Sequence, residues 1–141
     1  VAQNADLSGA TTNAVYATQG SQISVMGANC SGAGSNAIHA DECSQIAASG
    51  ANCSNSGNAA IYAFRASIID ANGADARNSG SVTAAVHAVR GSSINANEVD
   101  TTGSTGVGFN VTRGSFIAAN DGIGTLGQTA NQLTNHGIIF Q

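Results

Sequence analysis

A repeat of about 23 residues runs through the chain and limits the folds that it can adopt. A four-residue pattern recurs along the chain: Ala, then Val or Ile, then Tyr or His, then Ala. It occupies 14–17, 37–40, 60–63 and 85–88, and a weaker copy follows at 108–111. Internal periods of about 20 to 50 residues are typical of solenoids, in which each repeat stacks on the one before.

Two further columns of apolar residues keep the same rhythm, which makes chance agreement a poor explanation. One column is Ile23, Ile46, Ile69, Ile94 and Ile117, and the other is Ala5, Ala28, Ala51, Ala74 and Val99. The pattern reaches the chain end, where 114–117 is matched by 137–140. The step from 60–63 to 85–88 is longer than the others by two positions, so we expect an enlarged turn between Arg77 and Thr83 that leaves the columns intact.

The local sequence favours β coils over leucine-rich repeats. Only three Leu are present, and the apolar segments are short, β-branched and bounded by Gly, Ser and Asn. The chain has no Pro, no Trp and few aromatic residues, which fits a thin core. We therefore predict an all-β domain over 1–141: a single-stranded right-handed parallel β-helix of about six coils, each of roughly 23–25 residues. Its inward column is Val15, Ile38, Ile61, Val86 and Phe109.

Composition argues against several classes of partner. The formal net charge is −4, with four Arg and no Lys, so a basic patch for nucleic acid is not expected. No apolar stretch approaches the roughly 20 residues of a membrane-spanning helix, so we predict no membrane insertion. Three Cys, an odd number without metal-type spacing, argue against a disulfide framework, and we predict no metal site and no cofactor. The chain does not begin with Met, which suggests a piece of a longer protein.

One outward face of the predicted coils carries an unusual set of side chains. Its first column is Tyr16, His39, Tyr62, His87 and Asn110, and its second is Thr18, Asp41, Phe64, Val89 and Thr112. An isolated solenoid has no need to expose such a mixed aromatic and apolar surface. We expect contact with another subunit here. Contact with sugar rings and a plain solvated ladder of rings remain alternatives.

Three arginines follow this face at coil spacing: Arg65, Arg90 and Arg113. Stacked cations repel unless carboxylates lie nearby, and Asp41, Glu42 and Asp70 are the local candidates. We expect salt bridges within or between chains. Arg also binds carboxylates through two nitrogens at once, so an acidic polysaccharide is the alternative.

The nucleophiles and acids of the chain do not form a catalytic arrangement in the sequence. Cys30 and Cys53 lie one coil apart, which would permit a disulfide, but buried free thiols are the commoner outcome. Glycosidic cleavage needs two acids that converge on one groove. Neither Asp70 with Asp75 nor Asp41 with Glu42 meets that requirement, so we predict no catalytic residue in this segment.

Several motifs resemble the C-terminal β-helical region of bacteriophage tailspike proteins, most closely the capsule-degrading spikes. They are the Gly-Ser-x-Ile-x-Ala unit at 91–96 and 114–119, the Ala-Val-His-Ala strand at 85–88, and the ending Gly-Ile-Ile-Phe-Gln at 137–141. The resemblance covers essentially the whole chain.

The resemblance implies a homotrimer, with three β-helices side by side in the tail of a virion. It implies a parent spike that attaches to host surface polysaccharide, capsule or lipopolysaccharide, and often depolymerises it. The chain is then a C-terminal module for trimerisation and stabilisation, not itself an enzyme. The expected trimer or glycan contacts are Tyr62, Phe64, His87, Val89, His39, Arg65, Arg90 and Arg113. A polysaccharide-binding or depolymerising (lyase or hydrolase) β-helix with sites between chains, and a bacterial adhesin passenger, remain alternatives.

Overall fold

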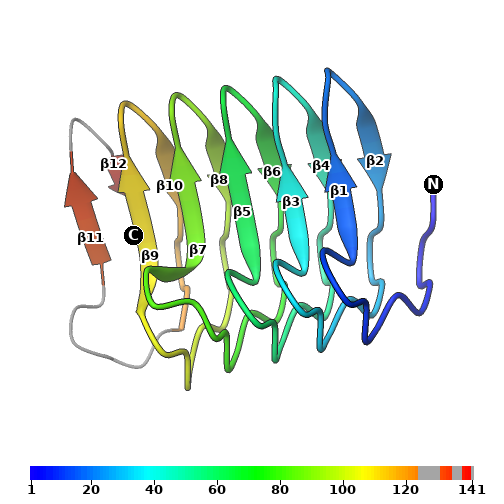
Figure 1. Ribbon diagram of the computed structural model, residues 1–141. Helices are drawn as coiled ribbons and strands as arrows, with labels where there is room; N and C mark the ends of the chain where they lie inside the picture. The colour runs from blue at the N-terminus through cyan, green and yellow to red at the C-terminus, as the bar shows by residue number, and fades with distance from the viewer. Residues whose placement is uncertain (124–130, 135–137, 141) are drawn as a thin grey trace.

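The protein is a solenoid of parallel β-strands. The computed structural model describes residues 1–123, 131–134 and 138–140, and this part contains strands and turns but no helix. As the chain advances from its N-terminal end, it runs up the front strands and down the back strands in Figure 1, which is the right-handed sense. The predicted fold class is confirmed.

Two parallel sheets form the long sides of the solenoid, and about five turns of the chain separate the first from the last strand of each. The first sheet contains β1 (Val15–Ala17), β3 (Ile38–Ala40), β5 (Ile61–Phe64), β7 (Ala84–Val89), β9 (Val107–Thr112) and β11 (Asn131–Thr134). The second sheet contains β2 (Gln22–Ser24), β4 (Gln45–Ala47), β6 (Ile68–Asp70), β8 (Ser93–Asn95), β10 (Phe116–Ala118) and β12 (Ile138–Phe140).

The repeated apolar columns form the core, as predicted. In the second sheet Ile23, Ile46, Ile69, Ile94 and Ile117 are partners in successive pairs of strands, and the last four are buried. The inward column of the first sheet, from Val15 to Phe109, is buried as well. The core is thin because Ala contributes most of its other members, such as Ala28, Ala51 and Ala74.

A column of serines closes the corner between the two sheets from inside. In all but the first, the hydroxyl oxygen accepts the backbone N–H of the equivalent serine one coil earlier, at 3.1 to 3.2 Å. The column is Ser21, Ser44, Ser67, Ser92 and Ser115, and all but the first are buried. These hydrogen bonds remove the free-energy penalty of unpaired polar groups in a corner that water does not reach.

The same corner turns sharply through two consecutive residues in the left-handed region. The first has φ between 49° and 57°, and the second between 60° and 74°. The pairs are Gln19–Gly20, Glu42–Cys43, Arg65–Ala66, Arg90–Gly91 and Arg113–Gly114. Positive φ at both central residues is the signature of a type I′ turn. Gly fills the second position in three coils because it lacks the Cβ that disfavours this conformation.

A third, narrow side is held by isolated parallel bridges that link Asp6, Asn29, Asn52, Asp75, Asp100 and Ile123. In the first five, a side-chain oxygen accepts the backbone N–H two residues further on, at 2.9 to 3.3 Å. Asn and Asp favour this local turn. The polar column therefore shapes the bend that returns the chain to the first sheet.

The two-residue extension of the long coil lies where the sequence predicts. Gly80 still donates to the carbonyl of Ser56, in step with Gly57 and Ala33 one coil earlier, so the extension follows Gly80. It emerges around Val82, which is 85% exposed. Beyond it, Val86 pairs with Ile61 in the ordinary columns.

The final coil has a register that differs by one position from the sequence match. Aligning 114–117 with 137–140 would pair Ile117 with Phe140. In the structure Ile117 pairs with Ile139, and Phe116 pairs with Ile138. The last coil is therefore one position shorter than the sequence match implies, which keeps Ile139 against the core in the isoleucine column.

Candidate functional site

Aromatic side chains form a continuous ladder on the outer face of the first sheet. Tyr16, His39, Tyr62 and His87 stack on adjacent coils, with ring centroids 4.8, 4.8 and 5.3 Å apart. Strand pairing puts them in register, because the same position of each strand faces the next. Tyr16 is 48% exposed and the other three are partly buried. Strand pairing therefore holds the four rings of the aromatic ladder in fixed relative positions on this face.

Phe64 adds a second ring beside this ladder and attracts two cations. Its ring lies 5.8 Å from that of Tyr62, and the guanidinium carbons of Arg65 and Arg90 lie 5.1 and 4.8 Å from its centroid. A guanidinium over an aromatic face is held by the ring quadrupole, with about 0.5–1 kcal/mol at exposed sites. We call Phe64, Arg65 and Arg90 the cation cluster.

Arg65 is also bound to carboxylates of the preceding coil. It donates to both oxygens of Asp41, with Nε at 2.7 Å from Oδ1, and lies 3.3 Å from Glu42. Its hydrogen bond is the main cause that holds the pKa of Asp41 below its usual value. The expected salt bridge thus forms with Asp41 and Glu42, and Arg65 is not open for a ligand carboxylate.

The structure brings seven of the eight candidate residues onto one face, where Val89 is the strand partner of Phe64, and leaves Arg113 apart from them. Tyr62, His39 and His87 belong to the ladder, and Phe64, Arg65 and Arg90 adjoin it. Val89 follows His87 on the same face but is only 7% exposed, so little of its surface is available to a partner. Arg113 is exposed at the next corner. Within the described part of the chain, its side chain makes no hydrogen bond, ion pair or ring contact with the other seven candidate residues.

The two histidines of the ladder are held in the neutral form. Burial lowers the pKa of His87 to about 4, and it also lowers that of His39. Within the described residues, Nε2 of each ring is shielded from solvent and has no hydrogen-bond partner. Neutral imidazoles pack on tyrosine rings without the desolvation cost of a buried charge.

A pocket of about 220 Å³ opens beside the N-terminal ends of β5 and β7. Its lining residues are Asn36, Asn58, Ala59, Tyr62, Ser81, Thr83 and His87. Asn36 is only 5% exposed, and its Oδ1 has no partner among the described residues. We call this cavity the asparagine pocket. Sequence reasoning identified Tyr62 and His87 but missed the other five residues.

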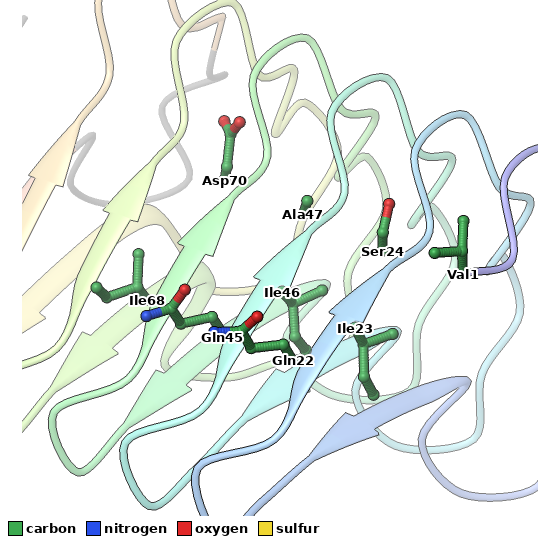
Figure 2. A pocket seen from close by; sticks show the side chains of 9 residues that line it. All are labelled: Val1, Gln22, Ile23, Ser24, Gln45, Ile46, Ala47, Ile68 and Asp70. Atoms are coloured by element: carbon green, nitrogen blue, oxygen red, sulfur yellow. The ribbon is translucent and has the colours of Figure 1, made fainter.

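A shallower groove of about 400 Å³ crosses the outer face of the second sheet. Figure 2 shows Gln22, Gln45 and Ile68 in one row along successive strands, with Ser24, Ala47 and Asp70 in a parallel row. Ile68 is 49% exposed, whereas Ile23 and Ile46 point toward the core. Val1 lies at the N-terminal margin of the groove.

Two of the acids considered in the sequence are engaged and two of the three thiols are buried, whereas Cys43 is an exposed free thiol. Asp75 pairs with Arg77 at 2.6 Å, and Asp70 accepts a hydrogen bond from Asn95 at 3.0 Å. Cys30 and Cys53 are buried free thiols, as expected, and burial raises the pKa of Cys30 to about 11. Raised thiol pKa values mean little thiolate, so these two side chains behave as small core residues.

Sites of two other kinds are absent from the described residues. No group of three or more His, Cys, Asp and Glu side chains there has an arrangement that could hold a metal ion. In the same ranges there is no helix with the length and apolar character needed to span a membrane.

No protein-family model matches the chain, and no curated protein matches it.

Proposed function

We propose that the chain is the C-terminal trimerisation and stabilisation module of a bacteriophage tailspike. In this proposal three copies pack side by side through the outer face of the first sheet. The parent spike attaches the virion tail to host surface polysaccharide, and this segment provides a rigid shaft without a catalytic role. The single observation that carries the proposal is the aromatic ladder with its adjoining cation cluster.

The ladder suits contact with an identical neighbour. Every coil of a parallel partner has the same rise, so rings on two chains meet at the same spacing along the whole ladder. Tyr16 is half exposed and the cluster around Phe64 is only partly covered. Aromatic residues and Arg are enriched where protein chains meet, because they combine a large contact area with polar ends.

Charge on this face also favours assembly. Arg65 is balanced by Asp41 and Glu42, whereas Arg90 has no ion pair within the described ranges. Glu42 retains a half-exposed side chain, at 41%. Arg90 is exposed and therefore available to a carboxylate of a neighbouring chain, which adds specificity more than affinity.

Sedimentation equilibrium of the chain tests the proposal. We expect three times the mass of one chain for wild type and a marked loss of trimer for the double variant Tyr62→Ser, Phe64→Ser. The matched control is Ile68→Ser, which removes an exposed apolar side chain from the second sheet. A monomeric wild type contradicts the proposal, and dissociation by Ile68→Ser alone places the contact on the other face.

A further inference from the structure

The asparagine pocket forms where one column of equivalent residues changes from Asn to Ala. Asn13 and Asn36 occupy equivalent positions on the first two coils, and Oδ1 of Asn13 accepts the backbone N–H of Asn36 at 3.1 Å. The equivalent residue on the third coil is Ala59. Its short side chain leaves the space that an Asn would fill, and Asn36 Oδ1 has no partner in the described structure, whereas Asn13 Oδ1 accepts the backbone N–H of Asn36.

The two-residue extension of the next coil supplies the other wall. Ser81 and Thr83 follow Gly80 in this longer coil and line the pocket together with Tyr62 and His87 of the ladder. The hydroxyl oxygen of Ser81 accepts the backbone N–H groups of Thr83 and Ala84, at 3.2 and 3.1 Å, which fixes its position. No acceptor for the hydroxyl proton of Ser81 is found among the described residues. The wall therefore offers a rigidly held donor.

The lining has the chemistry of a site for an uncharged polar ligand. It contains two amides, two aliphatic hydroxyls, a phenol and an imidazole, and none of its side chains carries a full charge at neutral pH. Two of its buried polar atoms, Asn36 Oδ1 and His87 Nε2, have no partner in the described part of the chain. Unmade hydrogen bonds of this kind each cost about 1–3 kcal/mol, so a ligand with hydroxyl groups, which both donate and accept, gains from both.

We propose that the asparagine pocket binds one neutral sugar ring, with its apolar face on the ladder and its hydroxyls toward Asn36, Ser81 and His87. A sugar ring combines C–H groups that pack on Tyr62 with hydroxyls that donate and accept. The volume of about 220 Å³ lies below the roughly 300–1,000 Å³ of pockets for larger ligands, which suits a single ring. The site lies at the margin of the first sheet and shares Tyr62 and His87 with the face through which the proposed trimer packs.

Titration with single sugars tests this site directly. The probes are the methyl glycosides of glucose, galactose and N-acetylglucosamine, with that of glucuronic acid as the charged counterpart, and the readout is the NMR shift of the ring protons of Tyr62 and His87. The blocking variant is Ala59→Asn, which restores the residue type of the two preceding coils. The control is Ala47→Asn on the second sheet, where the same column holds Asn95.

We expect at least one neutral glycoside to bind wild type and Ala47→Asn equally, and Ala59→Asn at least tenfold more weakly. Thr83→Val, at an exposed loop position, is the second variant should Ala59→Asn not fold, and it too weakens binding. The proposal is overturned if no neutral glycoside shifts these resonances, if the glucuronide binds more tightly, or if the blocking variants bind as wild type does. Sedimentation of the same samples reports the trimer separately.

Discussion

Arg65 reaches back across one coil and binds the buried carboxylate of Asp41 through Nε and Nη2, at 2.7 and 2.5 Å. The carboxylate is 6% exposed and the guanidinium 45%, so the two partners are not equivalent. Loss of the arginine leaves a charge inside the protein, whereas loss of the acid leaves one that water can solvate. The stability of this corner therefore depends more on Arg65.

The variant Arg65→Met is expected to lower the free energy of unfolding by about 2 kcal/mol, because a buried carboxylate loses its charged hydrogen-bond donors. The pKa of Asp41 is held below 3.8 in the folded protein, chiefly by Arg65. The stabilisation is therefore complete well above pH 3.8 and disappears as pH falls through the folded pKa. Urea unfolding at pH 7 and pH 3 measures both effects.

Arg113→Met is the control, since it makes the same change at the equivalent corner with an exposed side chain. It is expected to change stability by less than about 0.5 kcal/mol. Equal losses for the two variants would mean that the ion pair with Asp41 does not stabilise the fold.

Ala66 has a left-handed backbone at a position that glycine fills in three other coils. Its φ is 60°, and the equivalent residues Gly20, Gly91 and Gly114 have φ between 69° and 74°. Left-handed backbone costs a residue with a Cβ about 1–2 kcal/mol, partly offset by the greater unfolded-state entropy of glycine. Ala66→Gly is therefore expected to stabilise the chain by about 0.5–1 kcal/mol in urea unfolding.

The reverse change, Gly91→Ala, is expected to destabilise by a similar amount. A Cβ built on Gly91 meets nothing within 4 Å, so the effect comes from φ alone. Changes of the same sign in both variants would contradict the left-handed assignment of this corner.

Gly57 shows a different constraint, that of close stacking between coils. A Cβ there would overlap the backbone carbonyl oxygen of Gly34 on the preceding coil, and φ is not in the left-handed region. Gly57→Ala is expected to lower stability by about 2 kcal/mol, because backbone must move to admit the methyl group. Thermal unfolding of Gly57→Ala and Gly91→Ala in the same experiment measures this. A smaller loss of stability for Gly57→Ala than for Gly91→Ala would contradict the close stacking of backbone at Gly57.

The fold follows from the sequence because each coil repeats the same environments. Stacking places like residues on like residues, so Ile46, Ile69 and Ile94 appear in the sequence at the spacing that they have in space. The serine column could have been found in the same way, since Ser stands two residues before each of the inward isoleucines from Ile23 to Ile117. Its hydrogen-bonding role becomes evident only once that corner is known to be buried.

The asparagine pocket could not have been predicted in this way. It depends on a side chain that is absent at Ala59 and on the path of a loop near Thr83, and neither follows from periodicity. The register of the last coil is another case. Matching by residue type favoured Phe140 opposite Ile117, whereas the inward column requires Ile139. The near burial of Val89 also depends on local packing that a face assignment does not describe.

The aromatic ladder gives the protein a stability that depends on pH. His87 titrates with a pKa of about 4 when folded, against 6.5 for an unperturbed histidine, because burial disfavours the imidazolium. Between these values the unfolded chain binds more protons than the folded one, so acid favours unfolding. Stability is therefore expected to fall as pH drops from about 6.5 toward 4, by about 3 kcal/mol from this residue, and to lose nothing further from it below that.

His87→Gln removes this proton uptake and keeps a neutral polar side chain in the ladder. Urea unfolding at pH 7, 5.5 and 4 is expected to give a flatter pH profile for the variant than for wild type. His39→Gln flattens the profile too, since the pKa of His39 is lowered by the same cause. An unchanged slope in both variants would mean that the imidazoles are solvated in the folded protein. The ladder would then be open to water, whereas Nε2 of both imidazoles is shielded from solvent in the structure.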